Sequence, residues 1–91
     1  IEPGVYKEGK HGIRIENIVV VDEDIKTDSG QFMKFEMLSF VPIDLNCIDV
    51  TLLTEKEKEW LNNYHKDVYE KLSPYLNDEE RAWLKEKTRE I

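Results

Sequence analysis

The chain is short of several residue types that would define a function class. It has one cysteine, two histidines and three prolines among 91 residues. The single cysteine, Cys47, excludes an internal disulfide and is typical of a reducing compartment. Basic side chains are outnumbered, with 13 Lys and Arg against 20 Asp and Glu. The net charge is therefore −7, and no basic footprint for nucleic acid is present.

Long apolar runs are absent as well. No segment approaches the roughly 20 apolar residues of a membrane-spanning helix, and no signal-peptide pattern is present. We therefore expect a soluble chain without a membrane or nucleic acid partner. The balance of 40% apolar and 36% charged residues is typical of a globular domain, whose small size limits its core. Because the chain opens at Ile1, inside an apolar run and without an initiator methionine, we expect it to be part of a longer protein.

The first half of the chain has the pattern of β structure. Apolar-rich runs at Ile1–Tyr6 and Ile13–Val21 predict two strands joined by a polar turn. Asp22–Gly30 is polar and rich in turn formers, which predicts a link. Apolar side chains alternate in Gln31–Phe40, which predicts a strand with one face more apolar than the other. Pro42 ends this strand because proline has no N–H for the ladder.

The second half has the pattern of two helices. Thr54 opens a capping box (T-x-x-E), which predicts a helix from there to about Leu72. A Ser-Pro step interrupts the pattern, and a second helix follows to about Glu90, capped by Asn77 or Asp78. Short links between helices favour antiparallel packing. The predicted fold class is therefore α+β, with antiparallel strands followed by a helical hairpin.

Two carboxylates in the first predicted hairpin carry most of the functional information. Glu2 and Glu16 lie 14 residues apart, and a hairpin centred on Gly9 sets one opposite the other. Directly opposed residues share a face, with Cβ atoms roughly 4.5–5.5 Å apart, and like charges there repel. A cation would offset this repulsion, and hard divalent ions prefer oxygen ligands. Arg14 and Tyr6 lie on the same face of their strands, where Arg14 can orient a metal-bound carboxylate.

A plainer interpretation of each residue stays open at this point. The loop need not be symmetric, in which case one Glu points to solvent at a strand end. Arg14 is then a charge partner of a strand Glu, and Tyr6 is a packed aromatic. His11 is predicted to be a polar group of the turn and His65 a helix surface or interface residue, and neither is predicted to bind metal. Gly12 is predicted to relax the chain before the second strand.

Four short motifs, IEPGVY, GIRIEN, VPID and WLNNYH, occur in this order along the chain. The first two are similar to the end of the catalytic domain of the Xaa-Pro aminopeptidases (aminopeptidase P), which are pita-bread metallopeptidases. VPID, a leucine-rich link and WLNNYH resemble the C-terminal extension of the same family, so the resemblance covers nearly the whole chain. It implies that residues 1–44 are the C-terminal strands of a pita-bread catalytic domain and that residues 45–91 are a helical extension.

The resemblance also implies a metal site. The family binds two divalent ions, expected here to be Mn²⁺, through two Asp, one His and two Glu. The two Glu fall at Glu2 and Glu16, and Tyr6 and Arg14 match positions that support these ligands. The Asp and His ligands have no match in this chain. None of its residues is therefore predicted to be catalytic, and the 91 residues alone are predicted to be inactive.

The function that the resemblance implies is that of a cytoplasmic hydrolase, which removes the N-terminal residue from peptides with proline in second position. Its expected partners are this peptide, the remainder of the parent catalytic domain and further copies of the chain in a homo-oligomer. The alternative is a non-catalytic structural or protein-interaction module, in which a small sheet and a helical hairpin dock onto a partner. An upstream sequence that carries the missing Asp and His ligands would favour the enzyme.

Overall fold

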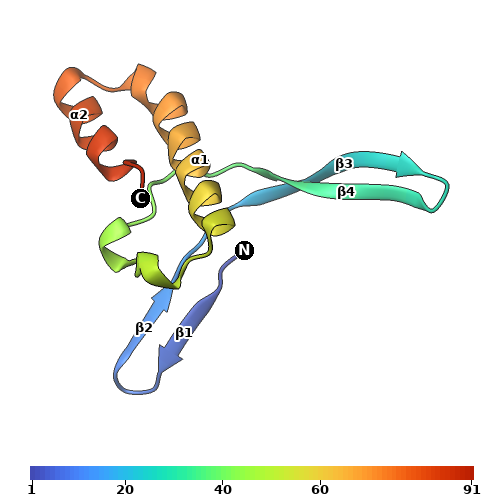
Figure 1. Ribbon diagram of the computed structural model, residues 1–91, viewed down its shortest axis with the longest axis horizontal. Coiled ribbons are helices and arrows are strands. Elements are labelled where there is room, and N and C mark those ends of the chain that lie inside the picture. The colour runs from blue at the N-terminus through green and yellow to red at the C-terminus, as the bar shows by residue number, and fades with distance from the viewer. The chain divides into compact units, whose positions relative to one another are not determined.

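The computed structural model describes all 91 residues, which form two compact units, Ile1–Ser39 and Phe40–Ile91. The first unit consists of two antiparallel β-hairpins, each of two strands. The second contains two α-helices, with short 3-10 turns before and between them (Figure 1). The predicted α+β class, with antiparallel strands followed by a helical hairpin, is therefore confirmed.

The first hairpin pairs β1 (Gly4–Lys7) with β2 (His11–Arg14), and its register confirms the predicted centre at Gly9. The numbers of the two residues in every pair sum to 18. The turn is closed by a 3.0 Å hydrogen bond from the Lys10 N–H to the Lys7 carbonyl. Gly9 has a φ of 67°, in the left-handed region that glycine enters without a steric cost.

The strand predicted over Ile13–Val21 is wrong as a single strand. β2 ends at Arg14, and β3 (Val19–Thr27) belongs to the second hairpin. Between them the backbone of Asn17 hydrogen-bonds to the first hairpin, and that of Ile18 to the second. The apolar run continues across a junction at which the pairing partner changes, and side-chain polarity alone does not reveal that change.

The second hairpin pairs β3 with β4 (Gly30–Met37) across a two-residue turn. The link predicted over Asp22–Gly30 is wrong, because most of this segment is strand. Nearly all side chains of this two-stranded ribbon are exposed, so polar residues are accepted on it. Asp22 lies directly opposite Lys34, a pairing of opposite charges that favours the strand. The strand predicted over Gln31–Phe40 is confirmed in its first part.

A β-bulge interrupts the ladder of the second hairpin. Glu23 pairs with Met33, and Lys26 pairs with Gln31, so β3 holds one residue more than β4 between these pairs. Before the bulge, one face of the hairpin is mainly apolar, as the alternation predicted. The apolar members of this face are Val19, Val21, Met33, Phe35 and Met37.

Both helices of the helical unit begin at the residues that the sequence predicts. α1 (Glu55–Leu72) has Thr54 as its N-cap, α2 (Asp78–Lys87) has Asn77, and both capping boxes are complete. α2 ends before the predicted position, where the Thr88 hydroxyl donates to a carbonyl of the last turn at 2.8 Å. Neither helix combines the length and the apolar character that crossing a membrane requires.

Three 3-10 turns complete this unit. They are η1 (Leu45–Cys47), η2 (Val50–Leu52) and η3 (Ser73–Tyr75). Asp44 and Asp49 cap the first two, because each carboxylate accepts a hydrogen bond from the N–H two residues later. The first two turns lie between the end of the strand unit and α1, and the third lies between the helices.

The core of the helical unit is small and lies mainly along one face of α1. Its buried apolar residues are Leu61, Tyr64, Val68 and Leu84. His65 is fully buried as well, so of the two positions predicted for it, helix surface or interface, the surface position is wrong. Its side chain lies inside because its Nε2 accepts a 2.9 Å hydrogen bond from the Ile43 N–H. This partner lies 22 residues away in the sequence, so a local sequence pattern cannot predict the contact.

Candidate metal centre

The ladder of the first hairpin continues beyond the ends of β1 and β2. The Ile15 N–H donates to the Pro3 carbonyl at 3.1 Å. Asn17 and Ile1 exchange both of their backbone hydrogen bonds, each at 3.1 Å. These residues keep the register in which pair numbers sum to 18, so the strands stay aligned up to Ile1.

This register sets Glu2 directly opposite Glu16. The two residues form a pair without mutual hydrogen bonds, in which opposing side chains lie closer than in a hydrogen-bonded pair. Both project from the same face of the hairpin, and both are exposed. A facing pair of carboxylates is therefore present, while metal binding by this pair stays a prediction.

Arg14 holds the carboxylate of Glu16. Its Nε donates to Glu16 Oε2 at 3.1 Å, and the two side chains are 53% and 46% exposed. An ion pair this exposed contributes little to stability, so its effect is mainly to orient the carboxylate. Glu2 is in none of the ion pairs of the chain. Two carboxylates and one guanidinium leave this face with a net negative charge, which favours a cation.

Tyr6 lies on the same face and covers two glycines. A Cβ atom added to Gly12 would lie 2.6 Å from Tyr6 Cδ1, and one added to Gly4 would lie 2.7 Å from the Tyr6 hydroxyl. Gly12 has no positive φ, so the role predicted for it, to relax the chain, is wrong. Both glycines instead make room for the ring. The sequence did contain a signal for this packing: Gly4 lies two residues before Tyr6 on one predicted strand, and Gly12 lies opposite Tyr6 on the other.

The chemistry of the donor set fits a divalent ion, but the set is incomplete. Two carboxylates offer the hard oxygen ligands that such ions prefer. No group of three or more His, Cys, Asp or Glu side chains in the chain is placed to hold a metal ion. An ion held by Glu2 and Glu16 therefore needs further ligands from outside these 91 residues.

The two histidines of the chain differ in their surroundings. His11 begins β2, where it is exposed and pairs with Lys7. His65 is buried in the helical unit, and its burial lowers the pKa of the imidazole. The ring is therefore neutral at pH 7, and its Nε2 lone pair already accepts the Ile43 N–H. That neither histidine binds metal stays a prediction.

A family model described as the C-terminal region of peptidase_M24 matches residues 31–91. The chain belongs to this family. Two relatives of this chain are described as probable Xaa-Pro aminopeptidase P. The one from Coprinopsis cinerea is 46% identical over 99% of this chain. The one from Fusarium vanettenii is 49% identical over the same share of the chain.

A solved structure is similar to this chain over the whole length of the chain. It is an X-prolyl aminopeptidase from Caenorhabditis elegans, described as a cytosolic enzyme with a di-nuclear active site. The TM-score is 0.86, and the sequence identity is 38% over 100% of this chain. The chain spans only 15% of both curated relatives and 16% of the solved chain, so it corresponds to a C-terminal part of such enzymes.

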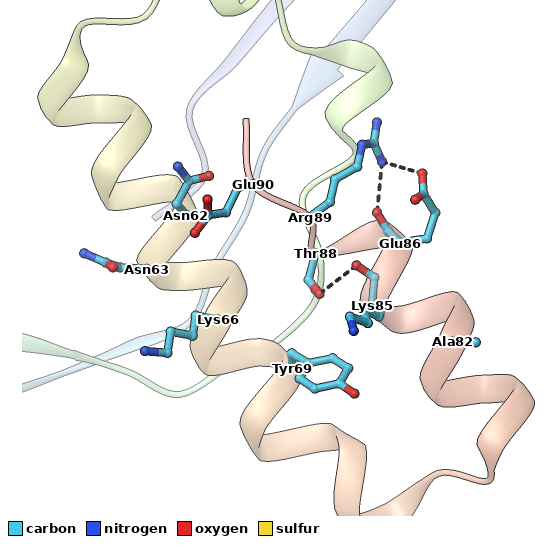
Figure 2. Close-up of a pocket in the computed structure, with 10 residues that line it drawn as sticks. All are labelled: Asn62, Asn63, Lys66, Tyr69, Ala82, Lys85, Glu86, Thr88, Arg89 and Glu90. Carbon is cyan, nitrogen blue, oxygen red and sulfur yellow. Dashed lines mark hydrogen bonds and ion pairs between the residues drawn. The ribbon is translucent and has the colours of Figure 1, made fainter.

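The helical unit contains a cavity of about 620 Å³ between α1 and α2 (Figure 2). Its lining residues are Asn62, Asn63, Lys66, Tyr69, Ala82, Lys85, Glu86, Thr88, Arg89 and Glu90. Asn62 holds the chain after α2 at this cavity, since its side chain accepts from the Ile91 N–H at 3.0 Å. Arg89 donates to the Glu86 carbonyl and pairs with the Glu86 carboxylate. No residue of the strand unit lines this cavity.

Proposed function

We propose that this chain supplies two of the metal ligands of a cytoplasmic Xaa-Pro aminopeptidase, a hydrolase with two divalent ions, expected to be Mn²⁺. The observation that carries the proposal is the register that sets Glu2 opposite Glu16 in a chain related throughout to such enzymes. The relatives support this function and not the non-catalytic module. The substrate is a peptide with proline in second position.

Each residue of the face has a separate role in this proposal. Glu2 and Glu16 bind the ions, Arg14 orients Glu16 through the 3.1 Å bond to its Oε2, and Tyr6 covers the backbone beside Glu2. Bound divalent ions lower the pKa of a water and stabilise negative charge on the carbonyl under attack. The chain itself contributes position, since its hairpin register keeps two carboxylates together against their repulsion.

The proposal divides the chain by role. Residues 1–44 complete the catalytic domain, and residues 45–91 form a helical extension of it. The remaining ligands, two Asp and one His, come from the remainder of that domain, so the 91 residues alone have no aminopeptidase activity. The exposed apolar face of the second hairpin and the free strand edges favour contacts with that remainder and assembly into a homo-oligomer.

The proposal is tested in the longer protein that contains this chain. Metal content and hydrolysis of an Xaa-Pro peptide are measured for Glu2→Gln, Glu16→Gln and Arg14→Gln. Each Glu variant loses bound Mn²⁺ and loses more activity than the roughly 10–100-fold that follows removal of a supporting residue, which is the loss expected for Arg14→Gln. Glu23→Gln, an exposed carboxylate on β3, is the matched control and keeps both properties. Full metal content in Glu16→Gln would refute the proposal.

A further inference from the structure

The residue after Glu16 is bonded to both hairpins. The backbone N–H and carbonyl of Asn17 are paired with Ile1 of the first hairpin, each at 3.1 Å. The side chain turns to the second hairpin, where Asn17 Oδ1 accepts a 2.9 Å hydrogen bond from the Ser39 hydroxyl. Asn17 thus fixes the end of one ladder against the end of the other.

Ser39 completes this junction with a single hydroxyl that is both acceptor and donor. Its Oγ accepts the Ile18 N–H at 2.8 Å and donates to Asn17 Oδ1. Hydrogen bonds connected in this way polarise and strengthen one another. The Leu38 N–H adds a 2.8 Å bond to the Ile18 carbonyl, which extends the β3–β4 ladder by one pair.

The junction is the least exposed place in the strand unit. Only four residues of Ile1–Ser39 are half-buried, and the rest are exposed. The four are Asn17, Val19, Met37 and Ser39. A two-stranded hairpin is marginally stable in water, and its open end frays most readily. Bonds made in this sheltered position therefore hold the end of the hairpin that carries both carboxylates.

Glu16 lies between two residues whose backbones are fixed. Ile15 is bonded to Pro3, and Asn17 is bonded to Ile1 and Ser39. We propose that Asn17 and Ser39 are positioning residues that keep the Glu16 carboxylate opposite Glu2. This inference rests on the proposed role of the two Glu as metal ligands.

The test uses the longer protein and Mn²⁺ as the probe, with free Mn²⁺ measured by electron paramagnetic resonance. Ser39→Ala leaves the Ile18 N–H without its acceptor and weakens Mn²⁺ binding about 10–100-fold, the range for outer partners of metal ligands. Ser39→Thr keeps the hydroxyl and restores binding to within about threefold of the original. Asn17→Ala behaves like Ser39→Ala. Ser29→Ala, the same change in the turn of the second hairpin, leaves the affinity unaltered.

Two results would overturn the inference. One is Ser39→Ala with unchanged Mn²⁺ affinity. The other is Ser39→Thr with a loss as large as that of Ser39→Ala, which would indicate a steric role instead of a hydroxyl-specific one. Failure of the proposed function is recognised separately, because Glu16→Gln would then retain Mn²⁺. In that case amide hydrogen exchange at Ile15 and Asn17 still measures the junction, and an unaltered rate in Ser39→Ala would refute it.

Discussion

The strand unit and the helical unit are stabilised by different means. All five buried residues of the chain lie in Phe40–Ile91, and none lies in Ile1–Ser39. The helices pack an apolar core, whereas the hairpins rely on backbone ladders and expose side chains such as Phe35 at 66%. The candidate metal centre is therefore built on the unit that has no core of its own. Its geometry depends on the backbone ladder of the first hairpin and on the hydrogen bonds of Asn17 and Ser39.

The largest expected effect comes from removing core volume in the helical unit, which the strand unit should not register. Leu84→Ala deletes a side chain that is 2% exposed and destabilises the helical unit by about 2–5 kcal/mol. Leu52→Ala, the same change at a residue that is 79% exposed, costs no more than about 0.5 kcal/mol. Urea unfolding followed by circular dichroism measures both. Amide resonances of β1 and β2 that shift as widely as those of α1 in Leu84→Ala would show that the effect of the lost volume is not confined to the helical unit.

Acid should weaken the helical unit through His65. Burial lowers the pKa of this imidazole in the folded state below its ordinary value of 6.5, so the unfolded state binds the proton more readily. The stabilisation is fully present above about pH 6.5 and is lost as the pH falls toward the folded-state pKa. Protonation also removes the acceptor of the Ile43 N–H, a loss of about 1–3 kcal/mol, in a site where Nδ1 has no partner. Melting temperatures from pH 8 to pH 5 should decline.

Two variants test whether His65 is the source of this pH dependence. Gln at position 65 can accept a hydrogen bond and does not titrate, so His65→Gln melts lower at pH 8 but varies less with pH. His11→Gln changes the exposed histidine and keeps the original slope. A slope in His65→Gln as steep as in the unmodified chain would place the titrating group elsewhere.

A smaller effect tests the packing on the strand unit. Gly12→Ala sets a methyl group 2.6 Å from Tyr6 Cδ1 and destabilises the first hairpin by about 1–3 kcal/mol. Amide hydrogen exchange in β1 and β2 should accelerate while the helices stay protected. Adding Tyr6→Ala removes the clash. The double variant should therefore lose less stability than the sum of the losses in the two single variants. Strict additivity would show that the ring does not limit this position.

The smallest expected effect concerns a helix end. Thr54→Ala removes the hydrogen bond that the Thr54 side chain accepts in the capping box, and it lowers the free energy of unfolding of the helical unit by about 1 kcal/mol. Thr54→Ser keeps the oxygen that accepts the Glu57 N–H at 3.2 Å and serves as the control. In thermal unfolding, Thr54→Ala should melt below both Thr54→Ser and the unmodified chain. Equal stability of the Ala and Ser variants would exclude the cap as a source of stability.

Local signals in the sequence predicted the features that depend on neighbouring residues. The capping box at Thr54 and the hairpin centre at Gly9 are read from a few positions, and the structure contains both. The buried position of His65 depends on Ile43, which a local pattern cannot connect to it. The change of pairing partner at Asn17 is hidden for the same reason, because Ser39 lies 22 residues away. The facing carboxylates followed from spacing, whereas their role as metal ligands came from the family resemblance.

The β-bulge gives the second hairpin a tolerance to changes in length. Residues beyond Lys26 pair with β4 in a register shifted by one from that of Val19–Glu23. Inserting or deleting a residue between the bulge and the turn therefore alters the tip and leaves the pairs nearer the junction in place. Such a change at the tip leaves Glu16 in its position opposite Glu2.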